Sequence, residues 1–151
     1  MLRGNPYAIV SPVSIPQGTV ADGLFQGLAA FRKSWPGGGF SWDSRLSCVA
    51  SSFSTELESD ARTAVARTFK FQWTARTLRT AAEVIQEIAD QVGCLRQDQI
   101  LVATEPNDTL MAYGLWWPWG DDVTISFRIG LSGMSTVRYE ENFRELFGAS
   151  L

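Results

Sequence analysis

Three tryptophans, Trp116, Trp117 and Trp119, lie within four residues and are followed by two carboxylates, Asp121 and Asp122. A large flat ring with one polar N–H suits the wall of a ligand pocket. An aromatic face beside a carboxylate also suits an organic cation. The same residues are also typical of a crowded hairpin packed under helices or at a subunit interface, with the carboxylates in a solvated turn. Both interpretations are open at this point.

Strand alternation must separate these rings. On a strand, Trp116 shares one face with Ala112 and Gly114, while Trp117 shares the other with Tyr113. Both faces are apolar, so we expect both to be covered, and Gly114 marks a place where a bulky neighbour or ligand can approach the backbone. The predicted ligand-binding set consists of Trp73, Tyr113, Trp116, Trp117, Trp119, Asp121 and Asp122.

A second group of residues is basic and alternates with threonines. Its members are Arg62, Arg67, Lys70, Arg76 and Arg79. Guanidinium groups bind carboxylates and phosphates in bidentate fashion, and a helix N-terminus adds backbone donors. We therefore predict an anion site at Arg76, Arg79 and Thr80. The alternative is that these charges cover an ordinary solvated surface.

Catalytic chemistry has little support in the sequence. The chain contains no histidine, which excludes histidine-based triads and dyads and most zinc sites. The segment from Trp35 to Phe40 contains three glycines but lacks the lysine of a phosphate-binding loop. No catalytic residue, metal ion or cofactor is predicted. A carboxylate-based enzyme using Glu56, Glu58, Asp60 or Asp90 is the remaining alternative, although their spacing does not select it.

Length and charge narrow the protein class. We predict one domain, 1–151, because 151 residues with 45% hydrophobic and 19% charged residues have ordinary globular composition. The net charge of −3 disfavours binding to nucleic acid. Without an apolar run of membrane-spanning length or a signal peptide, we expect a soluble, cytoplasmic protein with no membrane partner. Cys48 and Cys94 are expected to be buried, reduced thiols.

The first half of the chain alternates between strand and helix patterns. We predict an edge strand over Tyr7–Val13, followed by a helix capped by Thr19 that ends by Trp35, before Pro36. A strand is expected over 45–54, with Leu46, Cys48 and Ala50 on one face. Residues 55–66 fit either a helix, with a capping box of Thr55 and Glu58, or a turn between two strands.

The second half gives stronger patterns. A strand is predicted from Thr68 to Ala75, with Phe69, Phe71 and Trp73 on one face, and a helix from Thr80 to Val92, with a capping box of Thr80 and Glu83. Three strands follow, over 99–104, 110–117 and 123–131. Ile125, Phe127 and Ile129 should face the core, and Thr124, Ser126 and Arg128 a wetter side. A last helix begins near Thr136, with its inner face formed by Tyr139, Phe143, Leu146 and Phe147.

This order predicts an α+β fold: an antiparallel or mixed sheet of about five to six strands with two to three helices mainly on one face. A duplicated, ferredoxin-like arrangement is an alternative within that class. The function expected first is a non-enzymatic binding module, in which the Trp-rich hairpin takes a small apolar or cationic ligand or a protein partner. A homo-oligomeric assembly subunit that buries the aromatic surface is second, and an enzyme is third.

Overall fold

The computed structural model describes the backbone of residues 15–149 and the side chains of residues 20–149. The predicted edge strand Tyr7–Val13 lies outside this range. The described helices are α1 (Ile15–Ser34), α2 (Glu58–Thr68), α3 (Glu83–Gln91) and α4 (Thr136–Leu146). The strands are β1 (Ser41–Asp43), β2 (Cys48–Ser54), β3 (Phe71–Trp73), β4 (Ile100–Ala103), β5 (Met111–Pro118) and β6 (Thr124–Ser132).

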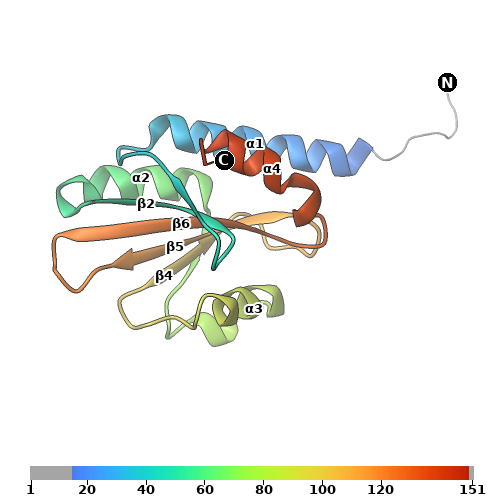
Figure 1. Ribbon diagram of the computed structural model, residues 1–151. Helices are drawn as coiled ribbons and strands as arrows, with labels where there is room; N and C mark the ends of the chain where they lie inside the picture. The colour runs from blue at the N-terminus through green and yellow to red at the C-terminus, as the bar shows by residue number, and fades with distance from the viewer. Residues whose placement is uncertain (1–14, 150–151) are drawn as a thin grey trace, which may run out of the picture.

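All six strands form one antiparallel sheet in the order β1-β2-β6-β5-β4-β3. The hairpin β1-β2 is followed by α2, which carries the chain to the far edge of the sheet, at β3 (Figure 1). From there β4, β5 and β6 return strand by strand until β6 pairs with β2. The predicted α+β class is confirmed, with four α-helices among the described residues rather than two to three. The connections do not repeat as in a duplicated ferredoxin-like arrangement: α2 joins β2 to β3 across β6, β5 and β4, whereas α3 joins the directly paired strands β3 and β4.

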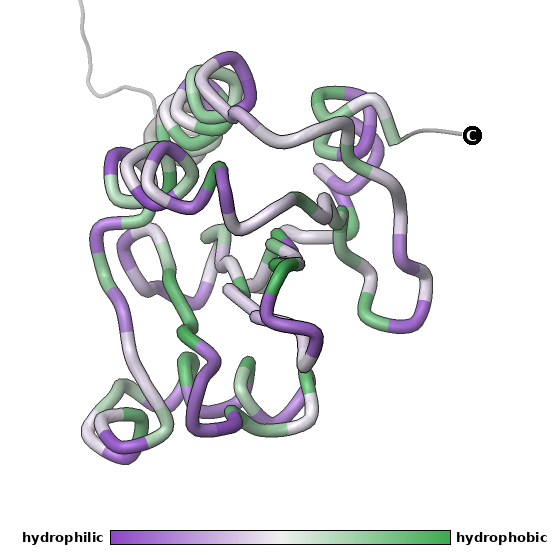
Figure 2. The backbone as a smooth tube through the Cα atoms, turned by 90° about the vertical axis from the view of Figure 1, so that its left-hand side faces the viewer, coloured by the Kyte–Doolittle hydropathy of each residue, from purple (hydrophilic) through white to green (hydrophobic). Residues whose placement is uncertain are grey.

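The helices divide unequally between the two faces of the sheet. Helices α1, α2 and α4 lie on one face, as predicted, and α3 lies on the other (Figure 1). Figure 2 shows the same separation from the side, with hydrophilic and hydrophobic residues alternating around the helical turns. We call these the α2 face and the α3 face. The core of the α2 face is the larger and is rich in aromatic rings, among them Phe31, Trp35, Phe69 and Phe127.

The register of β6 agrees with its sequence pattern. Ile125, Phe127 and Ile129 are buried in the core of the α2 face. Arg128 points to the α3 side, where its guanidinium lies near Asp43, with Nε 3.7 Å from Oδ2. Ser126 is buried rather than solvent-exposed, and its hydroxyl accepts a hydrogen bond of 3.0 Å from the Arg128 Nη1. The alternation is therefore confirmed, and the expected exposure of Ser126 is wrong.

Gly114 lies where a ring crosses the backbone, as its position in an apolar strand indicates. A Cβ at this residue would come within 2.8 Å of Phe127 Cε1 and 2.9 Å of Val102 Cγ2. Phe127 packs against Phe31, Phe69 and Trp116, so its ring has little room to move. The approaching group is thus a core side chain.

Helix starts are less well predicted than helix interiors. Helix α1 begins at Ile15, so Thr19 lies inside it and is not its N-cap. Residues 55–66 form a 3-10 turn (Thr55–Leu57) and most of α2, and the side chain that caps this segment is Ser54, whose hydroxyl accepts from the Glu56 N–H. The Thr80 and Glu83 capping box is also absent, because Ala82 is the N-cap of α3 and makes no side-chain hydrogen bond. In each case the cap is set by the backbone conformation of one residue, which spacing alone does not specify.

Two strand predictions are wrong in detail. The strand expected over 45–54 begins only at Cys48, because residues 44–47 form a turn, so Leu46 does not lie on it. Within β2, Val49 and Phe53 pack against the α2 face, and Cys48 and Ala50 lie on the other side. The strand predicted from Thr68 shrinks to β3, because α2 extends to Thr68 and Phe69 enters the core of the α2 face. Only Phe71 and Trp73 keep the expected common face, with their rings stacked 6.5 Å apart. Amphipathic helix and strand patterns overlap over such short segments.

The two cysteines differ from each other. Both are free thiols, as predicted, but Cys48 is buried in the sheet and Cys94 is exposed just after α3. Burial and the nearby Asp43 carboxylate raise the pKa of Cys48 to about 11. Among the described residues, no helix is long and apolar enough to cross a membrane.

Candidate functional site

The three clustered tryptophans do not form one pocket. Trp116 is 3% exposed and packs in the core of the α2 face against Phe53 and Phe127. Trp117, on the opposite side of β5, is half-buried. Trp119 lies beyond the strand in the turn and is 47% exposed. Strand alternation therefore distributes the rings as the sequence indicates, one inward on each face and one in solvent.

The other predicted aromatics lie on the α3 face. Tyr113 is buried beside Ile85, Ile88 and Met111, and Trp73 packs at the edge of the same cluster. Burial raises the pKa of Tyr113 well above its usual value. The Tyr113 ring crosses the backbone at Gly130, where a Cβ would come within 2.7 Å of its Cε1. Trp116 is on the other face of the sheet, so Trp73, Tyr113 and Trp116 do not line a common cavity.

Arginines occupy the tryptophan faces of β5. The Arg62 Cζ lies 4.9 Å from the ring centroid of Trp116. The Arg128 and Arg96 Cζ atoms lie 4.9 and 5.9 Å from that of Trp117. A guanidinium over an indole ring interacts with the same negative ring face that would attract an organic cation. These two rings are thus already paired with cations of the chain itself.

The two carboxylates that follow the tryptophans form the hairpin turn. Asp121 accepts hydrogen bonds from the backbone N–H groups of Val123 and Thr124, at 3.0 and 2.9 Å, and from the Thr124 hydroxyl at 2.8 Å. These hydrogen bonds hold the pKa of Asp121 below its usual value, and the bond from the Val123 N–H has the largest effect. Asp122 is exposed and adopts a left-handed φ of 63°. Their geometry is that of a solvated turn.

The predicted anion site lies at the exposed entrance to α3. Arg76 and Arg79 are exposed, and the Thr80 hydroxyl donates a 2.7 Å hydrogen bond to the Thr77 carbonyl. Glu83 occupies the first turn of α3, where its carboxylate already interacts with the positive end of the helix dipole. Arg79 and Thr80 belong to a short 3-10 turn, Leu78–Thr80, and Arg76 lies just before it, so the arrangement is that of an exposed, hydrogen-bonded surface turn.

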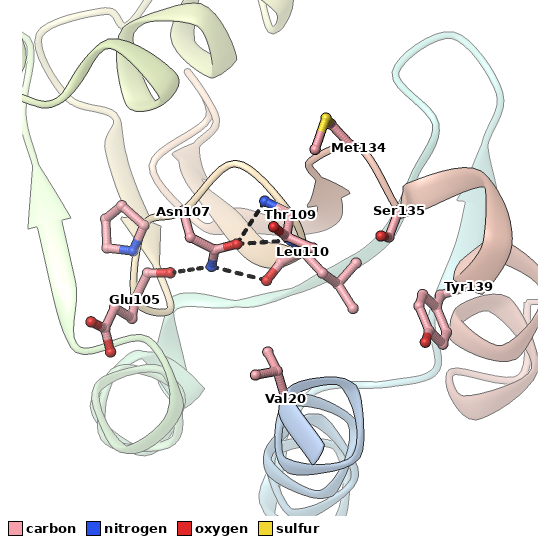
Figure 3. A pocket seen from close by; sticks show the side chains of 9 residues that line it. Val20, Glu105, Asn107, Thr109, Leu110, Met134, Ser135 and Tyr139 are labelled. Carbon is pink, nitrogen blue, oxygen red and sulfur yellow. Dashed lines mark hydrogen bonds between the residues drawn. The ribbon is translucent and has the colours of Figure 1, made fainter. Parts of the chain in front are cut away.

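A cavity that the sequence did not indicate lies between two loops and two helices. Its volume is about 680 Å³, within the range of roughly 300–1,000 Å³ typical of ligand sites. We call it the loop cavity (Figure 3). Val20 of α1 and Tyr139 of α4 form two of its sides, Leu110 and Pro106 come from the β4–β5 loop, and Met134 follows β6. Glu105, Asn107, Thr109 and Ser135 add polar groups.

The wall of the loop cavity is held by hydrogen bonds. The Asn107 amide donates to the carbonyls of Glu105 and Leu110, both at 3.0 Å, and accepts from the N–H groups of Thr109 and Leu110, both at 2.8 Å (Figure 3). The Met134 N–H donates to the Asp108 carbonyl at 2.9 Å, and the Ser135 N–H donates to the Thr109 carbonyl at 3.0 Å. These bonds join the β4–β5 loop to the β6–α4 turn. The wall is thus preformed.

Apolar side chains remain exposed around this cavity. Met134 is 83% exposed, and Val137, the second residue of α4, is 89% exposed. The Glu105 carboxylate lies on the opposite side of the cavity from the Tyr139 ring (Figure 3), so the two do not form an acid–aromatic cage. The sequence signal was weak: Met134 and Val137 have the spacing of a buried helix face, and exposure is not visible in spacing.

The structure gives little support to catalysis by carboxylates. Among the described residues, no group of three or more His, Cys, Asp or Glu side chains could hold a metal ion. Asp43 has a lowered pKa because Arg45 donates to it, with a distance of 3.3 Å between Nη2 and Oδ2, and it does not line the loop cavity. Glu56, Glu58 and Asp60 lie in one turn and the start of α2, whereas Asp90 lies on α3, across the sheet.

Comparison with known proteins leaves the family open: no family model, curated protein or solved structure matches this chain. The functional interpretation therefore depends on the geometry of the cavities.

Proposed function

We propose that this protein is a non-enzymatic binding module and that the loop cavity takes a small, largely apolar, uncharged ligand. The observation that carries the proposal is the preformed wall: Asn107 and the backbone bonds to Met134 and Ser135 fix two loops around an apolar space of about 680 Å³. A site whose walls are fixed before binding loses less conformational entropy when the ligand enters.

We expect an uncharged ligand for two reasons. The lining residues include no Lys or Arg that could pair with an anion, and Tyr139 alone cannot form an aromatic cage around a cation. Its apolar surface comes from Val20, Leu110, Met134 and Tyr139, and its polar groups are mostly amide and hydroxyl groups. The organic cation expected from the Trp-rich hairpin is disfavoured, because arginines already occupy the faces of Trp116 and Trp117. The proposed function is therefore still ligand binding, but the proposed site is the loop cavity instead of the Trp-rich hairpin.

The test uses the neutral fluorescent probe N-phenyl-1-naphthylamine, whose emission rises in an apolar site. We expect saturable binding to the wild-type protein and a loss of roughly tenfold or more in Val20→Arg, which places a charge at the cavity wall. Val137→Arg is the matched control, because it makes the same change at an exposed valine that does not line the cavity. If the two variants bind the probe equally well, the loop cavity is not the site.

A second candidate function, self-association, is favoured by the exposure of Met134 and Val137 beside the same cavity. Exposed apolar patches of this kind often mark protein interfaces. Sedimentation velocity distinguishes the two functions. A dimer that Val137→Arg dissociates supports assembly through this surface, and a monomer at all concentrations excludes it.

A further inference from the structure

A second cavity, of about 320 Å³, lies between α2 and the strands β3, β4 and β5. We call it the Trp116 cavity. Its apolar surface is formed by Val65, Phe69, Ile100, Val102 and Trp116, and its polar lining residues are Arg62, Lys70 and Gln72.

Trp116 has an unpaired polar group in this environment. Among the described residues no acceptor lies within hydrogen-bonding distance of its buried Nε1–H. A buried donor without a partner costs about 1–3 kcal/mol, so such groups in native proteins usually have an explanation. An acceptor oxygen on a molecule in the Trp116 cavity would remove this cost.

Access to Nε1 requires a side chain to move, because this atom is fully covered. Arg62 is suited to such movement. Its guanidinium lies over the Trp116 ring, yet its side chain is 52% exposed and is paired with Glu58, at 3.0 Å, on the surface. An exposed ion pair of this kind contributes about 0–1 kcal/mol, so a bound molecule can displace it at little cost.

The charges around the cavity favour an anion. Arg62 and Lys70 both line it, and none of the lining residues is acidic. Glu58 neutralises part of the charge of Arg62 through the ion pair, which leaves a net positive entrance. A guanidinium fork binds a carboxylate in bidentate fashion, and the apolar floor would receive a ring or an alkyl chain. A cation would meet repulsion here, with the face of Trp116 already occupied.

We propose that the Trp116 cavity is a second binding site, specific for a small carboxylate with an apolar body: Arg62 and Lys70 hold the carboxylate and Trp116 Nε1–H donates to one of its oxygens. The volume, near the lower end of the usual range, admits a single ring with a short acidic side chain. This site is separate from the loop cavity and does not depend on the function proposed for it.

The experiment compares phenylacetate with phenylacetamide, which has nearly the same shape without the charge. Binding is followed by isothermal titration calorimetry and by the indole N–H signal of Trp116 in ¹H–¹⁵N NMR spectra, assigned by its loss in Trp116→Phe. We expect phenylacetate to bind and to shift this signal, and phenylacetamide to bind roughly tenfold or more weakly, as the loss of a charge-assisted hydrogen bond predicts.

Three variants locate the charge. Arg62→Gln should weaken phenylacetate binding roughly tenfold. Glu58→Gln should strengthen it, because it releases Arg62 from its ion pair. Arg67→Gln is the matched control on the same helix, since Arg67 is exposed and does not line this cavity. Binding of N-phenyl-1-naphthylamine at the loop cavity should be unchanged in all three.

Several outcomes would overturn the proposal. Equal affinity for the acid and the amide would show that charge is not recognised. Equal losses of phenylacetate affinity in Arg62→Gln and Arg67→Gln would show that only the net charge of the protein matters. If phenylacetate does not bind, or binds without changing the Trp116 signal, then the Trp116 cavity is not a carboxylate site. The comparison of the acid with the amide and the arginine variants, followed by calorimetry, does not require Trp116→Phe to fold.

Discussion

Gly114 is the position where one added methyl group should disturb the core most directly. In Gly114→Ala the new Cβ would meet Phe127 on one side and Val102 on the other, at 2.8 and 2.9 Å. Overpacking of this kind costs about 1–3 kcal/mol, and the reduced entropy of the unfolded chain returns about 0.4–1 kcal/mol. The net loss should be about 1–2 kcal/mol, which for a chain of this size lowers Tm by roughly 2–8 °C.

The assay is urea denaturation followed by circular dichroism, with Gly120→Ala as the matched control. A Cβ at Gly120 would meet no atom within 4 Å, so this variant should stay within about 0.5 kcal/mol of the wild type. Phe127→Leu shortens the opposing side chain, so the double variant with Gly114→Ala should lose less stability than the sum of the single losses. Equal midpoints for Gly114→Ala and Gly120→Ala, or strict additivity in the double variant, would refute the close approach as the cause.

Three further predictions concern other parts of the molecule. Trp116→Ala should lower the free energy of unfolding by about 3–5 kcal/mol and Trp119→Ala by much less, measured by chemical denaturation; equal losses would contradict their different burial. Iodoacetamide should label one thiol of the native protein, Cys94, and none in Cys94→Ser, because Cys48 is buried and its pKa is raised to about 11; mass spectrometry counts the adducts, and labelling of Cys48 at neutral pH would contradict this. The pKa of Asp43 is lowered in the fold, first by the hydrogen bond from Arg45, so its ionisation stabilises the fold above the unfolded value of 3.8 and this contribution is lost as the pH falls through the lower, folded value. Asp43→Asn should therefore reduce the stability difference between about pH 5 and pH 3, and an unchanged difference would assign the acid sensitivity to other groups.

The parts of the fold that were predictable are those in which neighbours along the chain determine the structure. The alternation of Ile125, Phe127 and Ile129 selects one buried face of β6 because side chains on a strand repeat every two residues. The spacing of Ile85 and Ile88 selects the buried face of α3 in the same way. The cap at Ser54 was missed, since two candidate hydroxyls lay next to each other and only the backbone conformation distinguishes them.

The loop cavity could not be predicted because its residues meet only through the order of the sheet. Val20, Asn107 and Met134 come from three distant segments of the chain. They are brought together when β6 pairs with β5, which places the β6–α4 turn against the β4–β5 loop, and when Val20 of α1 lies opposite these loops across the cavity (Figure 3). No local pattern specifies which strands pair, so the sequence predicted the strands on either side of residues 105–109 without indicating what this connection faces.

The unequal cover of the sheet explains why β5 carries so many aromatic residues. It lies between β6 and β4, under the helices of the α2 face and above α3, so the residues from Met111 to Trp116 are buried on both sides. A strand that is covered on both sides needs bulky apolar side chains on both faces. Its tryptophans are therefore explained first by core packing and do not by themselves indicate a binding site. Recognition requires a further feature, a polar group that the core leaves unpaired. On β5 that feature is the indole N–H of Trp116, whose ring lines the Trp116 cavity that we propose as a binding site.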